Sequence, residues 1–273
     1  MFKNFFLNSR NKAIFQKSTY SYFSSNTLTN KPPKEFWNEF SETYTTKNEF
    51  QVLPFYFNLI NQLKVNEKNC NETILELAIG SGLGLKLLAD LTEAKIIGGD
   101  FSENMLEKAK KRISLQSNNY RSKNIDLRLL NNEDLNSISS QSINYVISNL
   151  SLNLVDKPEN MLKEVKRVLI PNGKAAFSIW GRPENNDFFT MIPKLMKKNG
   201  LNIGEGRSNF HMSKKDVCYK YCVDAGFKNV FLEYNDTIFN YENYEDLAYF
   251  IHSPNFSNIL NSNPIEKKRS SFK

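Results

Sequence analysis

The chain has 273 residues and a formal net charge of +7, from 36 basic and 29 acidic residues. This length excludes a peptide hormone or a disulfide-stapled mini-protein, and it is enough for one large domain with an appendage. Hydrophobic residues make up 40% and charged residues 24%, which is outside the disordered class. No run approaches about 20 consecutive apolar residues, so we expect no stable membrane insertion. Three cysteines are too few for a disulfide framework.

The positive charge lies at the two ends of the chain. Residues 1–34 contain six basic residues and no acid, and residues 267–273 contain four basic residues. The remaining body, residues 35–266, carries 26 basic and 29 acidic residues. A nearly neutral body argues against a broad phosphate-binding face, so we expect no nucleic-acid partner.

Residues 1–30 combine spaced cations with many Ser and Thr residues, bulky apolar side chains and no acid. This composition is typical of a mitochondrial presequence, because a cationic amphipathic segment is drawn across a potential that is negative inside. Arg10, Lys12 and Lys17 interrupt any apolar core of a secretory signal, and an unstructured basic tail is the alternative. We therefore expect a mitochondrial matrix location, a folded domain over 31–255 and a frayed tail over 256–273.

Short apolar runs alternate with helical patterns after Pro32-Pro33. Helices are expected near 34–45 and 50–64 and at Leu85–Leu91, Glu103–Leu115, Pro158–Leu169, Asp187–Lys198, Ser213–Ala225 and Asn243–Ile251. Strands are expected at Thr73–Ala78, Lys95–Gly99, Ile125–Leu130, Ile143–Ser148 and Ala175–Trp180, with a turn at Pro171-Asn172-Gly173 and β-rich pieces within Asn229–Phe239. This alternation predicts an α/β fold, a doubly wound and mostly parallel sheet with helices on both faces. Such sheets bind ligands at the carboxyl ends of their strands.

A glycine-rich loop follows the first predicted strand and carries Gly80, Gly82 and Gly84. Glycines let the backbone turn sharply and let a ligand approach closely, and the next helix offers free N–H groups at its start. Asp100 ends the second predicted strand, 20 residues after Gly80, where an acid can accept hydrogen bonds from both ribose hydroxyls. The loop alone is a weak signal, but together with Asp100 it predicts a nucleoside-containing cofactor.

These residues resemble the class I S-adenosylmethionine-dependent methyltransferases, in particular the small-molecule branch with the ubiquinone/menaquinone-biosynthesis C-methyltransferases. Leu75–Gly82 looks like the family's first motif, Gly99–Leu106 resembles its second-strand motif, and Arg167–Gly173 resembles its turn before the fifth strand. The resemblance runs from about Phe36 to about Ile251. It implies a seven-stranded Rossmann-like sheet of order 3-2-1-4-5-7-6, with S-adenosyl-L-methionine as cofactor. The cofactor-site residues that it implies are Tyr44, Glu76, Ala78, Gly80, Ser81, Gly82, Asp100, Phe101, Met105, Asn131, Glu133 and Asn149.

Four departures from the family's pattern bear on this site. Ala78 replaces the first glycine of the loop, and Asn131 replaces an acid that accepts from the adenine amino group. Asn144 replaces the usual Asp at the start of the fourth strand, and Asn153 stands where the family often has His. The last two leave the catalytic assignment open, so no catalytic residue is assigned.

Metal chemistry is not expected. Cys218 and Cys222 lie four residues apart on a predicted helix without a partnering His or Cys cluster, which is typical of buried small residues. The two histidines, His211 and His252, lie in the variable tail and are interpreted as surface or lid residues. Methyl transfer from a sulfonium needs mainly alignment of the acceptor and exclusion of water, so the lack of an evident base does not exclude catalysis.

The sequence thus predicts S-adenosylmethionine-dependent methyl transfer to a small-molecule acceptor. The alternative is a mitochondrial assembly or protein-modifying factor of the same fold, which binds the cofactor without methylating a small molecule. A nicotinamide-dependent oxidoreductase is disfavoured, because Leu85 stands at the third glycine of the dinucleotide fingerprint. Neither the identity of the acceptor nor an oligomeric state follows from these patterns.

Overall fold

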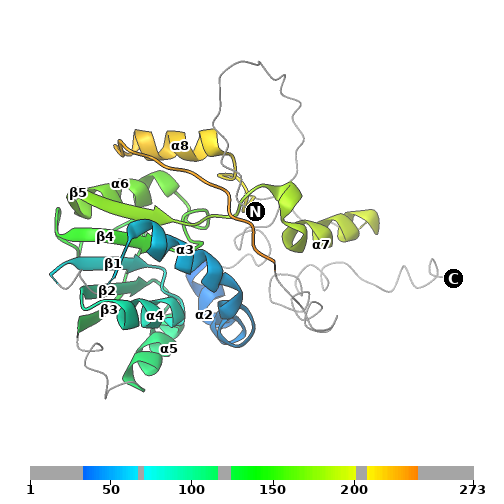
Figure 1. The fold of residues 1–273 in the computed structure, drawn as a ribbon. Helices are drawn as coiled ribbons and strands as arrows, with labels where there is room; N and C mark the ends of the chain where they lie inside the picture. Colours follow the sequence, from blue (N-terminus) through cyan, green and yellow to red (C-terminus); the bar gives the residue numbers. More distant parts are fainter. Residues whose placement is uncertain (1–32, 67–70, 116–123, 201–207, 239–273) are drawn as a thin grey trace.

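The computed structural model describes residues 33–66, 71–115, 124–200 and 208–238 (Figure 1). Five strands form one sheet of order β3-β2-β1-β4-β5, and every pair is parallel. The strands are β1 (Thr73–Leu77), β2 (Lys95–Asp100), β3 (Ile125–Leu129), β4 (Ile143–Ser148) and β5 (Leu169–Phe177). The expected α/β fold with a parallel sheet is therefore confirmed for the described part of the chain.

The strand order reverses at β1, which pairs with β2 on one side and β4 on the other. Leu77, the last residue of β1, lies opposite Gly99 of β2 and Ser148 of β4. The carboxyl ends of these three strands therefore meet at one edge of the sheet. In open parallel sheets the ligand lies at such a reversal, which places a candidate site there.

Helices cover both faces of the sheet (Figure 1). Alternate strand residues point to opposite faces: Leu75 and Val146 share a buried cluster with α6 and α8, while Ile74 and Ile147 share another with α3, α4 and α5. The helices are α2 (Pro33–Thr43), α3 (Leu53–Leu63), α4 (Leu83–Leu91), α5 (Glu103–Ser114), α6 (Pro158–Val168), α7 (Asp187–Lys198) and α8 (Lys215–Asp224). The result is a three-layer domain with the sheet at its centre.

The join between the first two helices is irregular. After α2 the chain makes a π-helical turn over Tyr44–Asn48 and a 3-10 turn over Glu49–Val52 before α3 begins. The hydroxyls of Thr45 and Thr46 donate to the carbonyls of Ser41 (2.7 Å) and Glu42 (3.0 Å). Such bonds to the preceding turn compete with regular helix geometry, so the predicted helices 34–45 and 50–64 are joined by a wound connection rather than a loop.

The predicted turn at Pro171-Asn172-Gly173 lies within β5, which begins at Leu169 rather than at the predicted Ala175. Ile143 lies opposite Leu169 and Tyr145 opposite Lys174, so the intervening residues form a bulge in which Asn172 has a φ of 65°. The β5 strand also ends at Phe177, which leaves Trp180 beyond the sheet. A bulge re-aims the strand without ending its pairing.

The prediction of β structure within Asn229–Phe239 is also wrong for residues 229–238, which form no strand. Phe231 is 71% exposed and Ile238 is 85% exposed, so these apolar residues have no neighbouring strand to pack beside. The described residues hold five strands rather than the seven that the resemblance implies. Residues 1–30, the predicted helix Asn243–Ile251 and the predicted tail 256–273 lie outside the described residues.

Candidate functional site

The glycine loop begins where β1 ends. Ala78, Gly80 and Gly82 have φ values of 55°, 56° and 79°, in the left-handed region. A Cβ on Gly82 would lie 2.8 Å from the Cβ of Ala109, so only glycine lets α5 pack directly against the loop. Ala78 carries a methyl group at a conformation that disfavours L residues by about 1–2 kcal/mol, a cost that glycine would not have.

Asp100 lies beside this loop at the carboxyl end of β2. It is 4% exposed, and its carboxylate accepts from Gly80 N at Oδ2 and from Ser102 N at Oδ1, both at 2.9 Å. Burial raises the pKa of Asp100 to about 6, and these backbone N–H groups limit the rise. A carboxylate has about four acceptor positions, so it retains capacity for hydroxyl donors. The predicted pair of loop and acid is thus in contact, and it fits the ribose of the implied cofactor.

Tyr44 lies over the glycine loop, as part of the π-helical turn. Its Cε1 is 3.3 Å from the position that a Cβ on Gly80 would take. Burial raises the pKa of the Tyr44 phenol, and the carboxylates of Glu49 and Asp100 raise it further. The phenol is therefore a neutral donor at physiological pH, next to the predicted cofactor loop.

Glu76 is held inside the sheet rather than at its edge. The Tyr56 hydroxyl of α3 donates to Glu76 Oε2 at 2.7 Å, and both residues are at most 3% exposed. Burial raises the pKa of Glu76 to about 8, with the bond from Tyr56 working against the rise. This carboxyl fixes α3 to β1 immediately beneath the loop.

The buried carboxyl of Glu76 gives a pH-dependence that can be tested. In the folded chain it stays neutral up to about pH 8, whereas in the unfolded chain it ionises near its ordinary value of 4.5. Between these values the folded state binds more protons, so the free energy of unfolding falls by up to about 1.4 kcal/mol per pH unit as pH rises. We expect urea unfolding at pH 5, 7 and 9 to show this fall in the wild type and a flatter profile in Glu76→Gln. Parallel profiles for the two proteins would contradict the assignment.

A charged cluster missed by the sequence interpretation fastens the N-terminal segment to the loop. Arg112 of α5 donates to both carboxylate oxygens of Glu49, from Nη2 to Oε1 at 2.7 Å and from Nη1 to Oε2 at 3.0 Å. Ser81, in the loop, donates to Glu49 and accepts from Arg112 Nη1 at 3.1 Å. Glu49 is only 3% exposed. Helical periodicity gives no signal for a pair 63 residues apart, so only the structure reveals it.

Phe101 and Met105 follow Asp100 into α5. Ser102 caps this helix, because its Oγ accepts from Met105 N at 3.2 Å. Asn38 of α2 reaches the same helix start, where its Oδ1 accepts from Ser102 Oγ at 2.6 Å. Met105 is 2% exposed, and Phe101 is half-buried. These contacts place both predicted residues beside Asp100 and hold α2 over them.

Asn131 and Glu133 follow β3. Leu130, which precedes them, donates its backbone N–H to the carbonyl of Asp100, so this segment lies beside the end of β2. Asn131 Oδ1 accepts from Glu133 N at 3.0 Å. The Glu133 carboxylate accepts from Asp156 N (2.8 Å) and Lys157 N (3.1 Å), at the start of α6. Glu133 thus has a helix-anchoring role in this structure, while Asn131 lies where an adenine-facing residue is predicted.

Asn149 connects three parts of the carboxyl edge. Its Nδ2 donates to the carbonyl of Val52 at 3.2 Å, and its Oδ1 accepts from Ser178 Oγ at 2.6 Å. It therefore ties the end of β4 to the N-terminal segment and to the end of β5. Asn149 directly follows Ser148, which lies opposite Leu77 at the edge where the strand order reverses.

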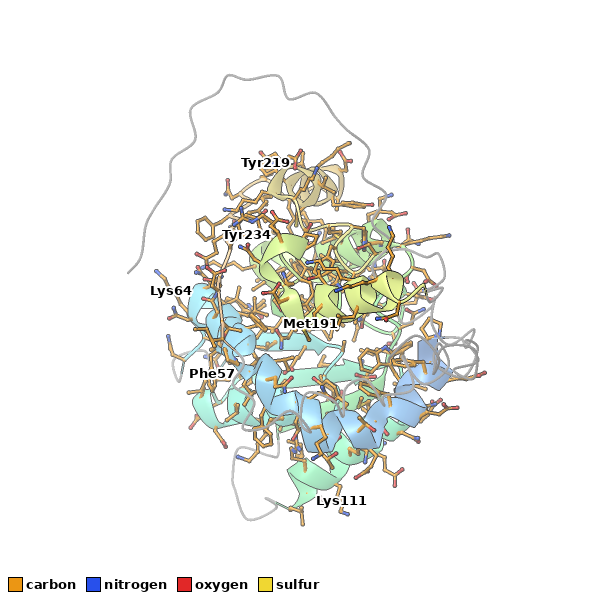
Figure 2. All side chains as sticks on the ribbon, turned by 90° about the vertical axis from the view of Figure 1, so that its right-hand side faces the viewer. Phe57, Lys64, Lys111, Met191, Tyr219 and Tyr234 are labelled. Carbon is orange, nitrogen blue, oxygen red and sulfur yellow. The ribbon has the colours of Figure 1, made fainter. Side chains whose placement is uncertain are left out.

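An aromatic cluster lies beyond β5 and consists of Phe55, Trp180, Phe189 and Phe210. The Trp180 ring is 4.5 Å from Phe189 and 5.9 Å from Phe55, and the Phe189 ring is 6.1 Å from Phe210, between centroids. The cluster joins α3, α7 and the segment before α8. Figure 2 faces this side of the molecule, with Phe57 of α3 below Met191 of α7. Trp180 follows the end of β5, so this cluster lies beside the carboxyl edge of the sheet and is the candidate acceptor side.

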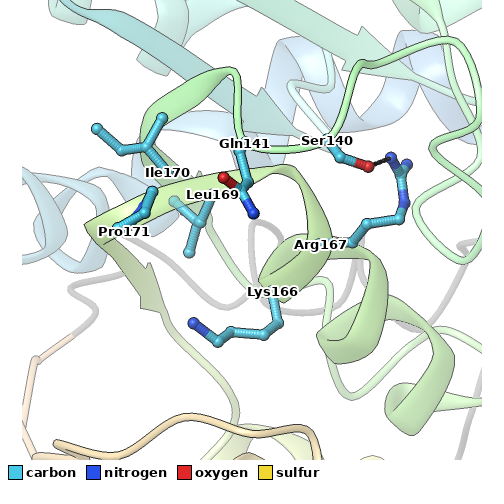
Figure 3. A pocket seen from close by; sticks show the side chains of 7 residues that line it. All are labelled: Ser140, Gln141, Lys166, Arg167, Leu169, Ile170 and Pro171. Atoms are coloured by element: carbon cyan, nitrogen blue, oxygen red, sulfur yellow. Dashed lines mark hydrogen bonds between the residues drawn. The ribbon is translucent and has the colours of Figure 1, made fainter.

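A separate cavity of about 450 Å³ lies at the opposite edge of the sheet (Figure 3). It is lined by Ser140, Gln141, Lys166, Arg167, Leu169, Ile170 and Pro171. Leu169 is the first residue of β5, so this cavity is at the amino ends of the strands. The Arg167 guanidinium is already bound by Glu164, Ile138, Ser140 and Leu135. This cavity is therefore no part of the site around the glycine loop.

No group of three His, Cys, Asp or Glu residues in the described part of the chain is placed to hold a metal ion. Among the described helices, none is both long and apolar enough to cross a membrane.

The sequence of this chain is similar to those of known methyltransferases. A methyltransferase domain family model matches residues 75–177, which span β1 to β5. The 2-phytyl-1,4-naphthoquinone methyltransferase of Trichormus variabilis is 36% identical over 125 residues, covering 44% of this chain and 51% of the relative. The demethylmenaquinone methyltransferase of Lactobacillus johnsonii is 26% identical over 231 residues, covering 75% and 90%. The chain thus spans about half the length of the first of these relatives.

Solved structures agree on the fold. The YcgJ protein of Bacillus subtilis has a TM-score of 0.52 at 14% identity, covering 76% of this chain and 81% of that one. A chain from the complex of the Haloferax volcanii Trm112 methyltransferase activator with a methyltransferase has a TM-score of 0.50 at 18% identity, covering 73% and 75%. Over residues 75–177, from β1 to β5, this chain is thus similar to the methyltransferase domain family, and the relatives named above are methyltransferases.

Proposed function

We propose that this chain binds S-adenosyl-L-methionine at the carboxyl ends of β1, β2 and β4 and transfers its methyl group to a small-molecule acceptor. The observation that carries the proposal is the buried Asp100 carboxylate, which is bonded to the glycine loop and keeps acceptor capacity. The relatives' names support the class of acceptor, since they include naphthoquinone and arsenite methyltransferases.

The proposed cofactor residues form groups according to the part of the cofactor that each would face. Asp100 accepts from the ribose hydroxyls, with Phe101, Met105 and Asn131 on the adenine side. The loop residues Ala78, Gly80, Ser81 and Gly82 give close backbone approach, and Tyr44, Glu76, Glu133 and Asn149 complete the surroundings. The bound cofactor supplies an electrophilic methyl group on a sulfonium. The protein's own contribution is to hold the acceptor in line with that group and to exclude water, which can lower the barrier by about 7–11 kcal/mol at best.

The experiment is a transfer assay with the full chain. Purified protein is incubated with S-adenosylmethionine carrying a radioactive methyl group and a mitochondrial extract, which is then separated into small molecules and macromolecules. We expect label in the small-molecule fraction, absent with Asp100→Ala. Label confined to protein, or cofactor binding without any transfer, would favour the alternative of a protein-modifying or assembly factor.

We also propose that residues 1–34 direct the protein to the mitochondrial matrix. Six basic residues without an acid support this proposal, because the membrane potential draws such a segment inward. A fluorescent reporter fused to residues 1–34 is expected to co-localise with a matrix marker. A matched fusion in which Lys3, Arg10, Lys12 and Lys17 are changed to Gln should stay in the cytosol. Diffuse cytosolic signal from the unchanged segment would contradict the proposal.

A further inference from the structure

The cavity at the amino ends of the strands is a second candidate site, remote from the glycine loop (Figure 3). Its volume of about 450 Å³ is within the range of small-molecule sites, which is about 300–1,000 Å³. It lies where α6 ends at Val168 and β5 begins at Leu169. A molecule bound there would meet apolar side chains together with a small number of polar ones, as ligands commonly do.

The Arg167 guanidinium lines the cavity but has no hydrogen-bond donor left for a ligand. It carries five N–H donors, and all five are in use. Nε and Nη2 each donate to the Glu164 carboxylate at 2.8 Å. The other three donate to Ser140 Oγ and to the carbonyls of Ile138 and Leu135. Because Glu164 also balances the charge, Arg167 forms a fixed and electrically compensated wall.

Lys166 is the lining cation that keeps its charge available. Among the described residues its ammonium forms no ion pair, and it lies 6.0 Å from the centre of the Phe227 ring. That distance is at the outer limit of a cation–π contact. The lining residues therefore present a single uncompensated positive charge, which favours a ligand with one negative charge.

The backbone beside the cavity argues against a phosphate. Gln141 N donates to the Arg167 carbonyl at 3.0 Å, and Ser142 N donates to the Val168 carbonyl at 2.9 Å. These bonds satisfy the last carbonyls of α6 and hold Gln141 in the left-handed region, at a φ of 52°. Phosphate sites use free backbone N–H groups or a bidentate arginine. Both kinds of donor are already occupied here, whereas a carboxylate needs fewer.

The side chain of Gln141 supplies a second polar contact. Its amide makes no hydrogen bond to a described residue, and it carries two N–H donors. The opposite character comes from Leu169, which is buried, Ile170, which is half-buried, and Pro171. Packing a hydrocarbon group on these three side chains removes apolar surface from water on both partners.

We propose that this cavity binds a small amphipathic carboxylate. The carboxylate accepts from the Lys166 ammonium and the Gln141 amide, and the hydrocarbon part packs on Leu169, Ile170 and Pro171. The inference goes beyond the proposed function, because the cavity and the glycine loop lie at opposite edges of the sheet. The carboxylate and the methyl donor can therefore be bound at the same time.

The test titrates the full chain by calorimetry with octanoate, with 1-octanol and with inorganic phosphate. Each titration is made with and without saturating S-adenosylhomocysteine. The variants are Lys166→Met, which keeps the length of the side chain without its charge, and Gln141→Gly, which suits the positive φ. The matched control is Lys163→Met, an exposed lysine of α6 that does not line the cavity. Melting temperature is measured for each protein.

We expect the wild type to bind octanoate about tenfold more tightly than 1-octanol, the equivalent of one hydrogen bond to a charged group. Lys166→Met should lose this preference, and Gln141→Gly should weaken octanoate binding by about threefold. Lys163→Met should behave as the wild type. The variants should melt close to the wild type, because the three changed side chains are exposed.

Several results would overturn the inference. They are equal affinity of the wild type for octanoate and 1-octanol, phosphate bound as tightly as octanoate, and unchanged octanoate affinity in Lys166→Met. A loss of affinity in Lys163→Met as large as in Lys166→Met would assign the effect to general surface charge. Displacement of octanoate by S-adenosylhomocysteine would assign it to the glycine-loop site. If S-adenosylhomocysteine does not bind, the proposed function fails, and the titrations without it still decide this inference.

Discussion

Asp100→Ala is expected to weaken S-adenosylhomocysteine binding by about 10²–10⁴-fold at pH 7.5. At that pH the carboxylate is ionised, because its pKa is about 6. Each hydrogen bond from a ribose hydroxyl to a charged carboxylate contributes about 1.5–3 kcal/mol, and two such bonds are lost. Calorimetric titration of the full chain measures the change. The matched control is Asp126→Ala, on the neighbouring strand, whose carboxylate pairs with Arg128 at 2.6 Å.

The pH profile separates this role from a purely structural one. As pH falls below about 6, Asp100 takes up a proton and loses acceptor capacity, so wild-type affinity should fall by up to tenfold per pH unit. Asp100→Ala should lack this dependence. Gly80 N and Ser102 N also lose their acceptor in that variant; Asp100→Asn keeps one of the two acceptor oxygens without the charge, so it should fall between the wild type and Asp100→Ala in affinity. Affinity within threefold of wild type in a folded Asp100→Ala protein would contradict the assignment.

The β1–α4–β2 unit could be predicted from sequence because its signals are local. A short apolar run, glycines at the turn and an acid at the end of the next strand are each defined by neighbours along the chain. In the structure the loop and the acid lie side by side, with Gly80 N donating to Asp100 Oδ2 at 2.9 Å. The cap of α5 is local as well, because the Ser102 side chain accepts from Met105 N three residues further on.

The features that sequence reasoning missed depend on contacts between distant segments. Glu49 meets Arg112 63 residues away, and Asn149 meets Val52 97 residues away, and neither pair leaves a periodic trace. The β prediction for residues 229–238 failed for the same reason, since β-propensity expresses packing against a neighbouring strand that this segment lacks. The bulge at Asn172 likewise depends on pairing with β4 rather than on the Pro-Asn-Gly signal.

Removing Arg112 from its ion pair with Glu49 should lower the stability of the protein more than removing Glu49 does. Arg112→Ala leaves the Glu49 carboxylate, whose side chain is 4% exposed, without its countercharge, so we expect a loss of about 3–5 kcal/mol in the free energy of unfolding. Glu49→Ala is expected to cost less, because the Arg112 side chain is 21% exposed and can turn to water. Urea unfolding of the two variants measures this asymmetry. Lys108→Ala breaks the exposed Lys108–Glu42 pair between the same two segments and should have no measurable effect.

The same pair should also control the cofactor site, because Ser81 of the glycine loop bonds to both members. Arg112→Ala should therefore weaken S-adenosylhomocysteine binding as well as stability. The apolar double variant Glu49→Leu/Arg112→Met should recover much of the stability, since well-packed apolar residues often replace a buried ion pair without loss. It should not recover the affinity, because Ser81 still lacks both of its partners. Recovery of affinity together with stability would mean that the pair only holds the fold, whereas recovery of stability alone assigns Glu49 and Arg112 to positioning the loop.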